Sequence, residues 1–131
     1  MKKTPRFKAI IACGPVIIEK INGKKCVLLD KHGEKIWKFP GSSIHKKENA
    51  EQCAIKRVKE ELGINVKLIK PLKPIIIWRK GEAVVLIHFL AKRHGKIKPA
   101  KHIKQWAWIP INKLPKDCAK NIKIVLREMK D

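Results

Sequence analysis

The stretch GSSIHKKENAEQCAIKRVKEELGI, residues 41–64, decides the fold of this chain. A loop with glycine and serine runs into a polar segment, and a helical pattern begins after Asn49. Asn49 can cap that helix, with Gln52 three residues later closing a capping box. Gly63 suits the left-handed residue that ends a helix. Apolar residues recur at helical spacing between these ends and predict one buried stripe: Ala50, Cys53, Ala54, Val58 and Leu62.

A second face of the expected helix carries charge. Arg57, Glu60 and Glu61 are spaced at i, i+3 and i+4, so their side chains can meet. Adjacent carboxylates suit Mg²⁺, because this hard cation takes oxygen ligands. The guanidinium of Arg57 can instead bridge both carboxylates as an internal ion pair, and it would then replace the metal cation electrostatically.

The same stretch resembles the Nudix box, G-x5-E-x7-R-E-U-x-E-E-x-G-U, where U is a bulky aliphatic residue, and aligns to it without a gap. Glu48 takes the first Glu position and Glu60 and Glu61 the Glu-Glu pair. WAWIPINKLP, residues 106–115, resembles the W-V-P-L-x-x-L-P segment that closes many Nudix domains. The resemblance implies an α/β/α sandwich, with a mixed β-sheet, the central Nudix helix and a C-terminal helix.

Three positions depart from the family pattern: its Gly is Ser42, its Arg is Lys56, and its following Glu is Arg57. Lys56 keeps the positive charge but loses the planar fork of arginine. Ser42 can replace the glycine only if φ stays negative there or strain is tolerated. Arg57 matters most, because in the family the Glu at that position binds the catalytic metal together with the Glu-Glu pair.

The resemblance implies a Mg²⁺-dependent pyrophosphohydrolase site, if the site is active. Glu48, Glu60 and Glu61 would then be the metal ligands, and Glu60 and Glu61 the catalytic residues. A further carboxylate from a later loop is usual in the family, and Glu82 is the one candidate on that side of the chain. Because a cation stands at Arg57, we expect efficient hydrolysis to be lost.

The composition of the chain shows an unusually large excess of positive charge. The chain carries 32 Lys and Arg against 11 Asp and Glu, a formal net charge of +21. Self-repulsion at such a charge lowers stability, so a polyanionic partner explains the excess better than solubility does. We expect RNA or a ribonucleoprotein as that partner. A lipid surface and compositional drift toward lysine are the alternatives.

The densest basic segment is KRHGKIKPAKHIK, residues 92–104. Its glycine and proline indicate a loop, which could follow a phosphate backbone or be an ordinary solvated loop. The four tryptophans of the chain could stack on bases, although we expect at least two of them in the core. The candidate nucleic-acid-binding residues are Lys92, Arg93, Lys96, Lys98, Lys101 and Lys104.

The 131-residue length predicts a single domain over residues 1–131. A short basic lead occupies residues 1–6. Four widely spaced cysteines read as reduced thiols, and the lack of an apolar run of membrane-spanning length or a signal peptide predicts a cytoplasmic protein with no membrane partner. A C-terminal helix is expected from about Asp117. Strands are expected at residues 7–13, 16–21, 26–29, 36–39, 65–69, 75–78, 83–91 and 105–109, with a break at residues 14–15.

Two hypotheses follow from these patterns. In the first, a Nudix-type domain with an impaired or lost hydrolase site binds RNA through its basic surface, as a ribosomal or other ribonucleoprotein component. In the alternative, an active Mg²⁺-dependent Nudix hydrolase cleaves a nucleoside diphosphate derivative or an RNA 5′ end, with a nucleotide as its ligand. The sequence does not predict an oligomeric state.

Overall fold

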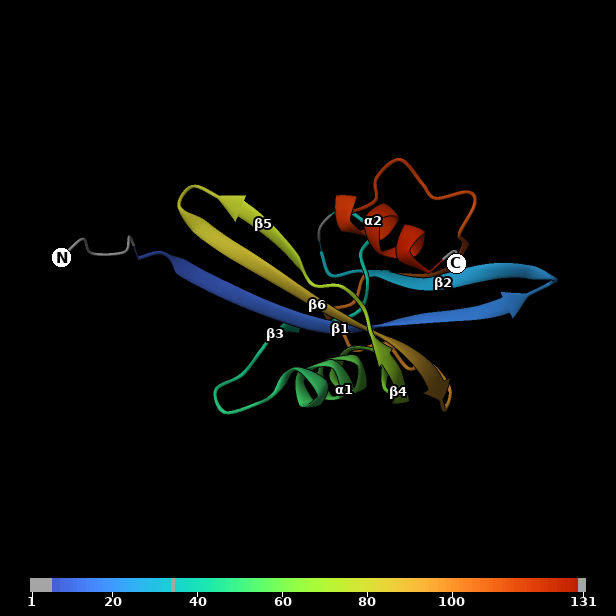
Figure 1. Ribbon diagram of the computed structural model, residues 1–131. Helices are drawn as coiled ribbons and strands as arrows, with labels where there is room; N and C mark the ends of the chain where they lie inside the picture. Colours follow the sequence, from blue (N-terminus) through green and yellow to red (C-terminus); the bar gives the residue numbers. More distant parts are fainter. Residues whose placement is uncertain (1–5, 34, 130–131) are drawn as a thin grey trace.

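The structure is a computed structural model that describes residues 6–33 and 35–129, so most of the expected basic lead lies outside the described residues. A mixed β-sheet is covered by one helix on each face (Figure 1). This arrangement confirms the expected α/β/α sandwich. The elements are β1 (Lys8–Ile21), β2 (Lys24–Lys31), β3 (Ser42–Ser43), α1 (Ala50–Leu62), β4 (Asn65–Pro71), β5 (Ile75–Arg79), β6 (Glu82–His94), β7 (Gln105–Pro110) and α2 (Lys120–Glu128).

The sheet is organised on two long strands, β1 and β6, which run parallel to each other. Its main order is β4-β6-β1-β2-β7, with β3 beside β1 and β5 beside β6. All pairings other than β1 with β6 are antiparallel. The hairpin turns fall at Asn22-Gly23 and Lys80-Gly81, and Asn22 and Lys80 adopt positive φ, as such tight turns require.

Neighbouring residues of the strands supply the cores on the two faces, because successive side chains point to opposite sides of a sheet. Val16 and Val27 pack in the cluster that includes Ile122 and Val125 of α2. Their neighbours Ile17 and Leu28 pack in the cluster that includes Val58 and Leu62 of α1. The two helices are therefore held by separate apolar layers.

Helix α1 begins and ends as the sequence predicts. The Asn49 side chain accepts a hydrogen bond from the Gln52 backbone, and the Gln52 side chain accepts one from the Asn49 backbone, which completes the capping box. Gly63 ends the helix in the left-handed conformation, with φ 69°. The expected stripe is buried, apart from Ala50, which is half-buried. Two charged residues, Arg57 and Glu61, are buried on the same helix.

The predicted break at residues 14–15 is wrong, since β1 passes through Gly14 and Pro15 without interruption. Pro15 lies between the residues of β1 that pair with β3 and those that pair with β2, so its missing N–H removes no hydrogen bond on that edge. Gly14 allows the neighbouring loop to approach, because a Cβ there would overlap the carbonyl oxygen of Pro40.

Two other boundaries differ from expectation. Residues 36–39 form no strand; Trp37 and Lys38 make isolated bridges to Cys118 and Asp30, and pairing with β1 occurs later, in β3. Helix α2 begins at Lys120 instead of about Asp117, because the backbone of residues 117–119 is bonded to Trp37. In both places, contacts between distant segments replace the local pattern.

The four cysteines are free, and Cys13, Cys26 and Cys53 are buried. Burial raises the pKa of the Cys13 thiol to about 12, and the pKa of Cys53 is raised for the same reason. No helix in the described part of the chain is both long and apolar enough to cross a bilayer.

Candidate functional site

Arg57 is an internal cation of the Nudix-like stretch. Its side chain is only 2% exposed, although it projects from the middle of α1. Nη2 lies 3.0 Å from Glu48 Oε2, and Nε lies 3.1 Å from Glu60 Oε1. The predicted pairing with Glu60 is therefore confirmed. The predicted pairing with Glu61 is wrong, because the carboxylate of Glu61 has other partners.

Glu48 holds Arg57 from the loop that precedes α1. Its Oε1 accepts the His45 backbone N–H at 2.8 Å, while Oε2 faces Arg57. The pKa of Glu48 is lowered, first by this backbone hydrogen bond and then by the charge of Arg57. Lys56 lies 3.8 Å from the same carboxylate and is 57% exposed, so it is the weaker partner. Both carboxylate oxygens of Glu48 are thus occupied by contacts within the loop and α1.

Glu61 is buried and turns to the opposite side. Its Oε1 accepts the Gly41 N–H at 2.9 Å and lies 3.5 Å from Nε2 of His32, which follows β2. The same His32 nitrogen lies 3.1 Å from Asp30 Oδ1. The two carboxylates raise the pKa of His32 to about 9, Asp30 contributing more than Glu61. An imidazolium at His32 therefore stabilises both carboxylates.

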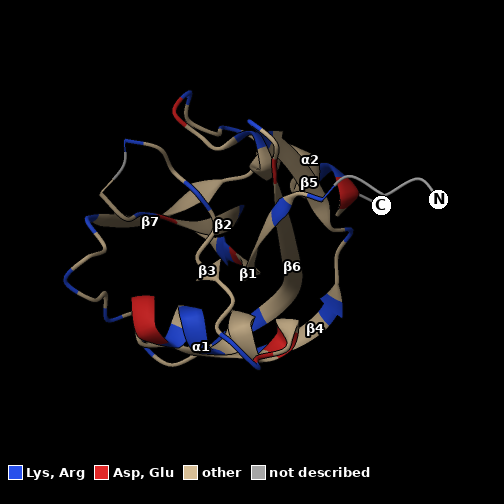
Figure 2. Cartoon of the chain, turned by 90° about the vertical axis from the view of Figure 1, so that its left-hand side faces the viewer, with Lys and Arg blue, Asp and Glu red and all other residues tan. Residues whose placement is uncertain are grey.

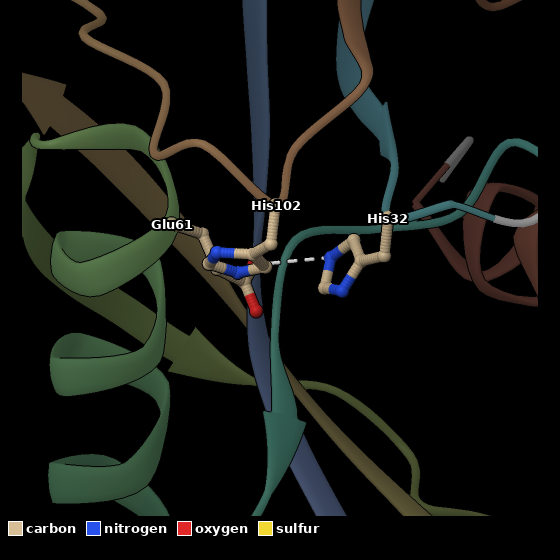
Figure 3. Close-up of side chains that lie close together, drawn as sticks. All are labelled: His32, Glu61 and His102. Atoms are coloured by element: carbon tan, nitrogen blue, oxygen red, sulfur yellow. Dashed lines mark ion pairs between the residues drawn. The ribbon is translucent and has the colours of Figure 1, made fainter.

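His102 completes this cluster from the loop before β7 (Figure 3). One ligand atom from each of His32, Glu61 and His102 lies within 4.8 Å of the others. The two imidazole rings meet edge to face, with centroids 5.6 Å apart. Sequence spacing could not reveal the cluster, because its members come from three distant segments.

The box carboxylates, as they lie, do not offer Mg²⁺ a shared set of oxygens. Glu48 and Glu60 are bound to Arg57, and Glu61 is bound to Gly41 and faces His32. A hard cation would have to separate these pairs and accept a buried guanidinium beside it. Three carboxylates of the implied site are thus present, and each already has a cationic or N–H partner.

Ser42 does not carry the conformation expected of the motif's glycine. It lies in β3, opposite Cys13, and its carbonyl accepts a bond from the Cys53 thiol at 3.6 Å. One residue earlier, Gly41 has a positive φ (134°), and a Cβ there would overlap the carbonyl oxygen of Cys13. Serine is therefore tolerated at position 42 without backbone strain.

Glu82, the candidate for a later carboxylate, lies away from these residues. It begins β6 in register with Lys8, and no described contact joins it to α1. The further carboxylate beside Glu61 is Asp30, at the end of β2 and fully buried. The box pattern does not predict it, because Asp30 precedes the box instead of following it.

A cavity of about 580 Å³ lies between β1, β6, the loop that contains Gly41 and the start of α2. Much of its lining is apolar, whereas its polar groups include Lys38, Arg79 and Asn121. His88 also lines the cavity, and burial lowers its pKa to about 4. Gly41, which belongs to the lining and donates to Glu61, connects the cavity with the His32 cluster.

The basic segment begins at the end of β6 and continues as a loop over the end of α1. Lys98 N–H binds the Leu62 carbonyl at 2.7 Å, and Ala100 N–H binds the Glu61 carbonyl at 2.8 Å. Arg93 is engaged internally, since it forms two 2.8 Å bonds to Glu19 and lies over the Trp108 ring. The other five candidates are exposed: Lys92, Lys96, Lys98, Lys101 and Lys104.

Basic residues are not confined to this loop. Figure 2 shows Lys and Arg on the segments around the whole view, with few acidic residues between them. Two tryptophans, Trp37 and Trp108, are partly buried against the two cores, as expected, whereas Trp78 is 61% exposed. Trp78 contacts Phe7 edge to face, with ring centroids 4.9 Å apart.

The fold and the box geometry define the class of this protein, and comparison with known sequences agrees. The NUDIX domain model matches residues 14–129, so the chain belongs to the Nudix family. It is 29% identical over 96 residues to the putative 8-oxo-dGTP diphosphatase YtkD of Bacillus subtilis (strain 168). It is 27% identical over 117 residues to the putative mutator protein MutT4 of Mycobacterium tuberculosis (strain CDC 1551 / Oshkosh).

The matches cover 73% and 79% of this chain but only 61% and 47% of those two relatives. Among solved structures, a MutT NUDIX hydrolase from Burkholderia pseudomallei superposes with a TM-score of 0.82 at 22% identity, covering 94% of this chain and 99% of that one. A C. elegans Ap4A hydrolase complex gives 0.79 at 22% identity, covering 92% and 94%. At this identity the structural likeness establishes the fold alone.

Proposed function

We propose that this Nudix domain has impaired Mg²⁺-dependent hydrolysis and binds RNA through its basic surface, as part of a ribonucleoprotein. The proposal that hydrolysis is impaired rests on the buried guanidinium of Arg57, which lies between Glu48 and Glu60. Metal-dependent cleavage of a diphosphate needs carboxylates to hold the cation that neutralises phosphate charge. In this chain an arginine already neutralises two of the three box carboxylates.

The proposal that the domain binds RNA rests on the net charge of the chain and on the exposure of its lysines. A chain of 131 residues at +21 attracts polyanions, and counterion release makes that attraction strong at low salt. Lys96, Lys98 and Lys101 are exposed on a loop whose backbone is fixed to the end of α1, so their charges are presented on an ordered scaffold.

Binding is tested by titrating a fluorescent single-stranded RNA at several salt concentrations. Charge reversal at Lys96, Lys98 and Lys101 should weaken binding and flatten the salt dependence. The matched control reverses Lys113, Lys116 and Lys123, three exposed lysines elsewhere that change the net charge equally. If the two variants weaken binding equally, attraction is nonspecific and the loop assignment is wrong. Salt-independent affinity in the native chain would reject the RNA proposal altogether.

A second candidate function is hydrolysis of a nucleoside diphosphate derivative, and the cavity favours it. An apolar lining with Asn121 can hold a base, while Lys38 and Arg79 can face phosphates. The relative named as a putative 8-oxo-dGTP diphosphatase points to the same class of ligand. Hydrolysis of a nucleotide panel with Mg²⁺ or Mn²⁺ separates the candidates, and turnover that disappears in Glu61→Gln would establish this one.

A further inference from the structure

His32, Glu61 and His102 bring two imidazoles and one carboxylate together at the junction of three segments. Their ligand atoms lie within 4.8 Å of one another, and His32 Nε2 is 3.5 Å from Glu61 Oε1. Four ligands at about 2.1 Å around a tetrahedral ion lie roughly 3.4 Å apart. The spacing therefore needs only a small contraction to enclose an ion.

The burial of Asp30 is a second observation, independent of the ligand spacing, that favours a cation at this cluster. Its side chain is fully buried, and neither carboxylate oxygen has a hydrogen bond from any described residue. Oδ1 nevertheless lies 3.1 Å from His32 Nε2, which is itself buried without a well-aligned hydrogen bond. In the metal-free chain the imidazolium of His32 compensates this buried carboxylate, and a divalent cation would take over that role once His32 gives up its proton. Because Asp30 Oδ1 and Glu61 Oε1 face the same nitrogen of His32, Asp30 would serve as a fourth ligand on the same ion.

The donor chemistry selects the class of metal. Imidazole suits Zn²⁺ and its transition-metal neighbours, whereas Mg²⁺ requires an octahedron of oxygens that this cluster does not provide. Two carboxylates, Asp30 and Glu61, would balance the charge of a divalent ion. Arg57 is directed to Glu48 and Glu60, so its guanidinium does not occupy this position.

We propose that His32, Glu61 and His102 bind a transition-metal cation of the Zn²⁺ class, with Asp30 as a buried fourth ligand. This site differs from a Mg²⁺ site on the box carboxylates in its two imidazole ligands, which come from outside the box. Because His102 belongs to the basic loop and Glu61 to α1, the ion would fix that loop to the helix (Figure 3). The proposal is independent of the proposed RNA binding.

Co²⁺ and Zn²⁺ themselves are the probes. The full chain, freed of metal with a chelator, is titrated with Co²⁺ while the visible d–d absorption of a tetrahedral site is recorded, and Zn²⁺ is then used to displace it. We expect one ion per chain, no thiolate charge-transfer band in the near ultraviolet, and no displacement by excess Mg²⁺. A thiolate band, or displacement by Mg²⁺, would overturn the proposed ligand set.

The decisive variant is His102→Ala, because this side chain is exposed and its loss leaves the core intact. Its matched control is His94→Ala, an exposed histidine outside the cluster. We expect His102→Ala to weaken Co²⁺ binding by at least about tenfold, as loss of a ligand requires, and His94→Ala to leave it unchanged. Unchanged Co²⁺ affinity in His102→Ala would refute the site, and a native-like melting curve in that variant shows that folding is not the cause of any loss.

Discussion

Arg57 lies 3.0 Å from the carboxylate of Glu48 and is almost completely buried by the fold. The adjacent residue on the helix, Lys56, lies 3.8 Å from the same carboxylate and remains exposed. The Arg-Glu pair of the Nudix box is Lys-Arg in this chain. The buried cation therefore stands at the position where the family has a carboxylate, and it satisfies the carboxylates around it.

Truncating the buried cation should destabilise the fold far more than truncating its neighbour. Arg57→Gln leaves the carboxylates of Glu48 and Glu60 without their cation, and we expect a loss of about 2 to 3 kcal/mol in the free energy of unfolding. Lys56→Gln, the matched control, should change it by less than about 0.5 kcal/mol, because an exposed pair contributes little. Urea unfolding measures the free energy of unfolding of both variants. Equal losses in the two would show that the buried pairing of Arg57 does not stabilise the fold.

Restoring a carboxylate at position 57 should make the fold responsive to Mg²⁺. In Arg57→Glu, the new carboxylate faces Glu48 and Glu60, so repulsion lowers the melting temperature in the absence of metal. Mg²⁺ at about 100 times its dissociation constant would restore roughly 2.7 kcal/mol. The native chain serves as control and should show no Mg²⁺-dependent shift; a shift of the same size there would contradict our account of Arg57.

Part of the loss of folding stability at low pH should come from protonation of His88. Burial lowers its pKa to about 4 in the fold, against 6.5 as the ordinary value. Between these values the unfolded chain binds a proton at this residue and the fold does not, so stability falls as pH decreases from 6.5 to 4. The upper bound is about 3 kcal/mol, from 1.36 kcal/mol per unit.

The measurement compares unfolding free energies at pH 7 and pH 4.5 in native protein and His88→Leu. Leucine is a suitable replacement because His88 Nδ1 is buried and has no hydrogen-bond partner among the described residues. The native chain should lose more stability on acidification than the variant does. His94→Leu, at an exposed position, should behave like the native chain. Identical pH profiles for native protein and His88→Leu would exclude this histidine as a source.

Close contact between β1 and the loop before β3 predicts a strong glycine effect. A Cβ in Gly14→Ala would overlap the Pro40 carbonyl oxygen, and a backbone atom cannot move aside as a flexible side chain can. We expect a loss of about 3 kcal/mol or more. Gly81→Ala is the comparison, since its turn has open space and only its positive φ is strained, at about 1 kcal/mol. Thermal unfolding should rank the two in this order, and the reverse order would contradict the contact.

Features set by neighbouring residues were predictable from the sequence. The capping box of Asn49 and Gln52, the end of α1 at Gly63 and the turn at Asn22-Gly23 all depend on local chemistry, and all are present. The strand through Pro15 was not predictable from the local pattern, because it depends on which edge of β1 is unpaired at that point.

The partners of Glu61 could not be predicted from the sequence either. His32 and His102 reach Glu61 only through the pairing of β2 with β7 and the attachment of the basic loop to α1. Spacing on the helix placed Glu61 beside Arg57, and the fold placed it beside Gly41 instead. Pairings within one helix can be derived from its period, whereas those between distant segments require the whole topology.

The Mg²⁺-dependent hydrolysis rate of the native chain tests most directly whether Arg57 has replaced the catalytic metal. The substrates are nucleoside triphosphates, dinucleoside polyphosphates and RNA with a 5′-triphosphate, and Glu61→Gln is the reference. If Arg57 has replaced the metal electrostatically, the native rate should not exceed that of Glu61→Gln on any substrate. Robust native turnover that is lost in Glu61→Gln would show that Arg57 has not replaced the metal and establish this Nudix domain as an active hydrolase.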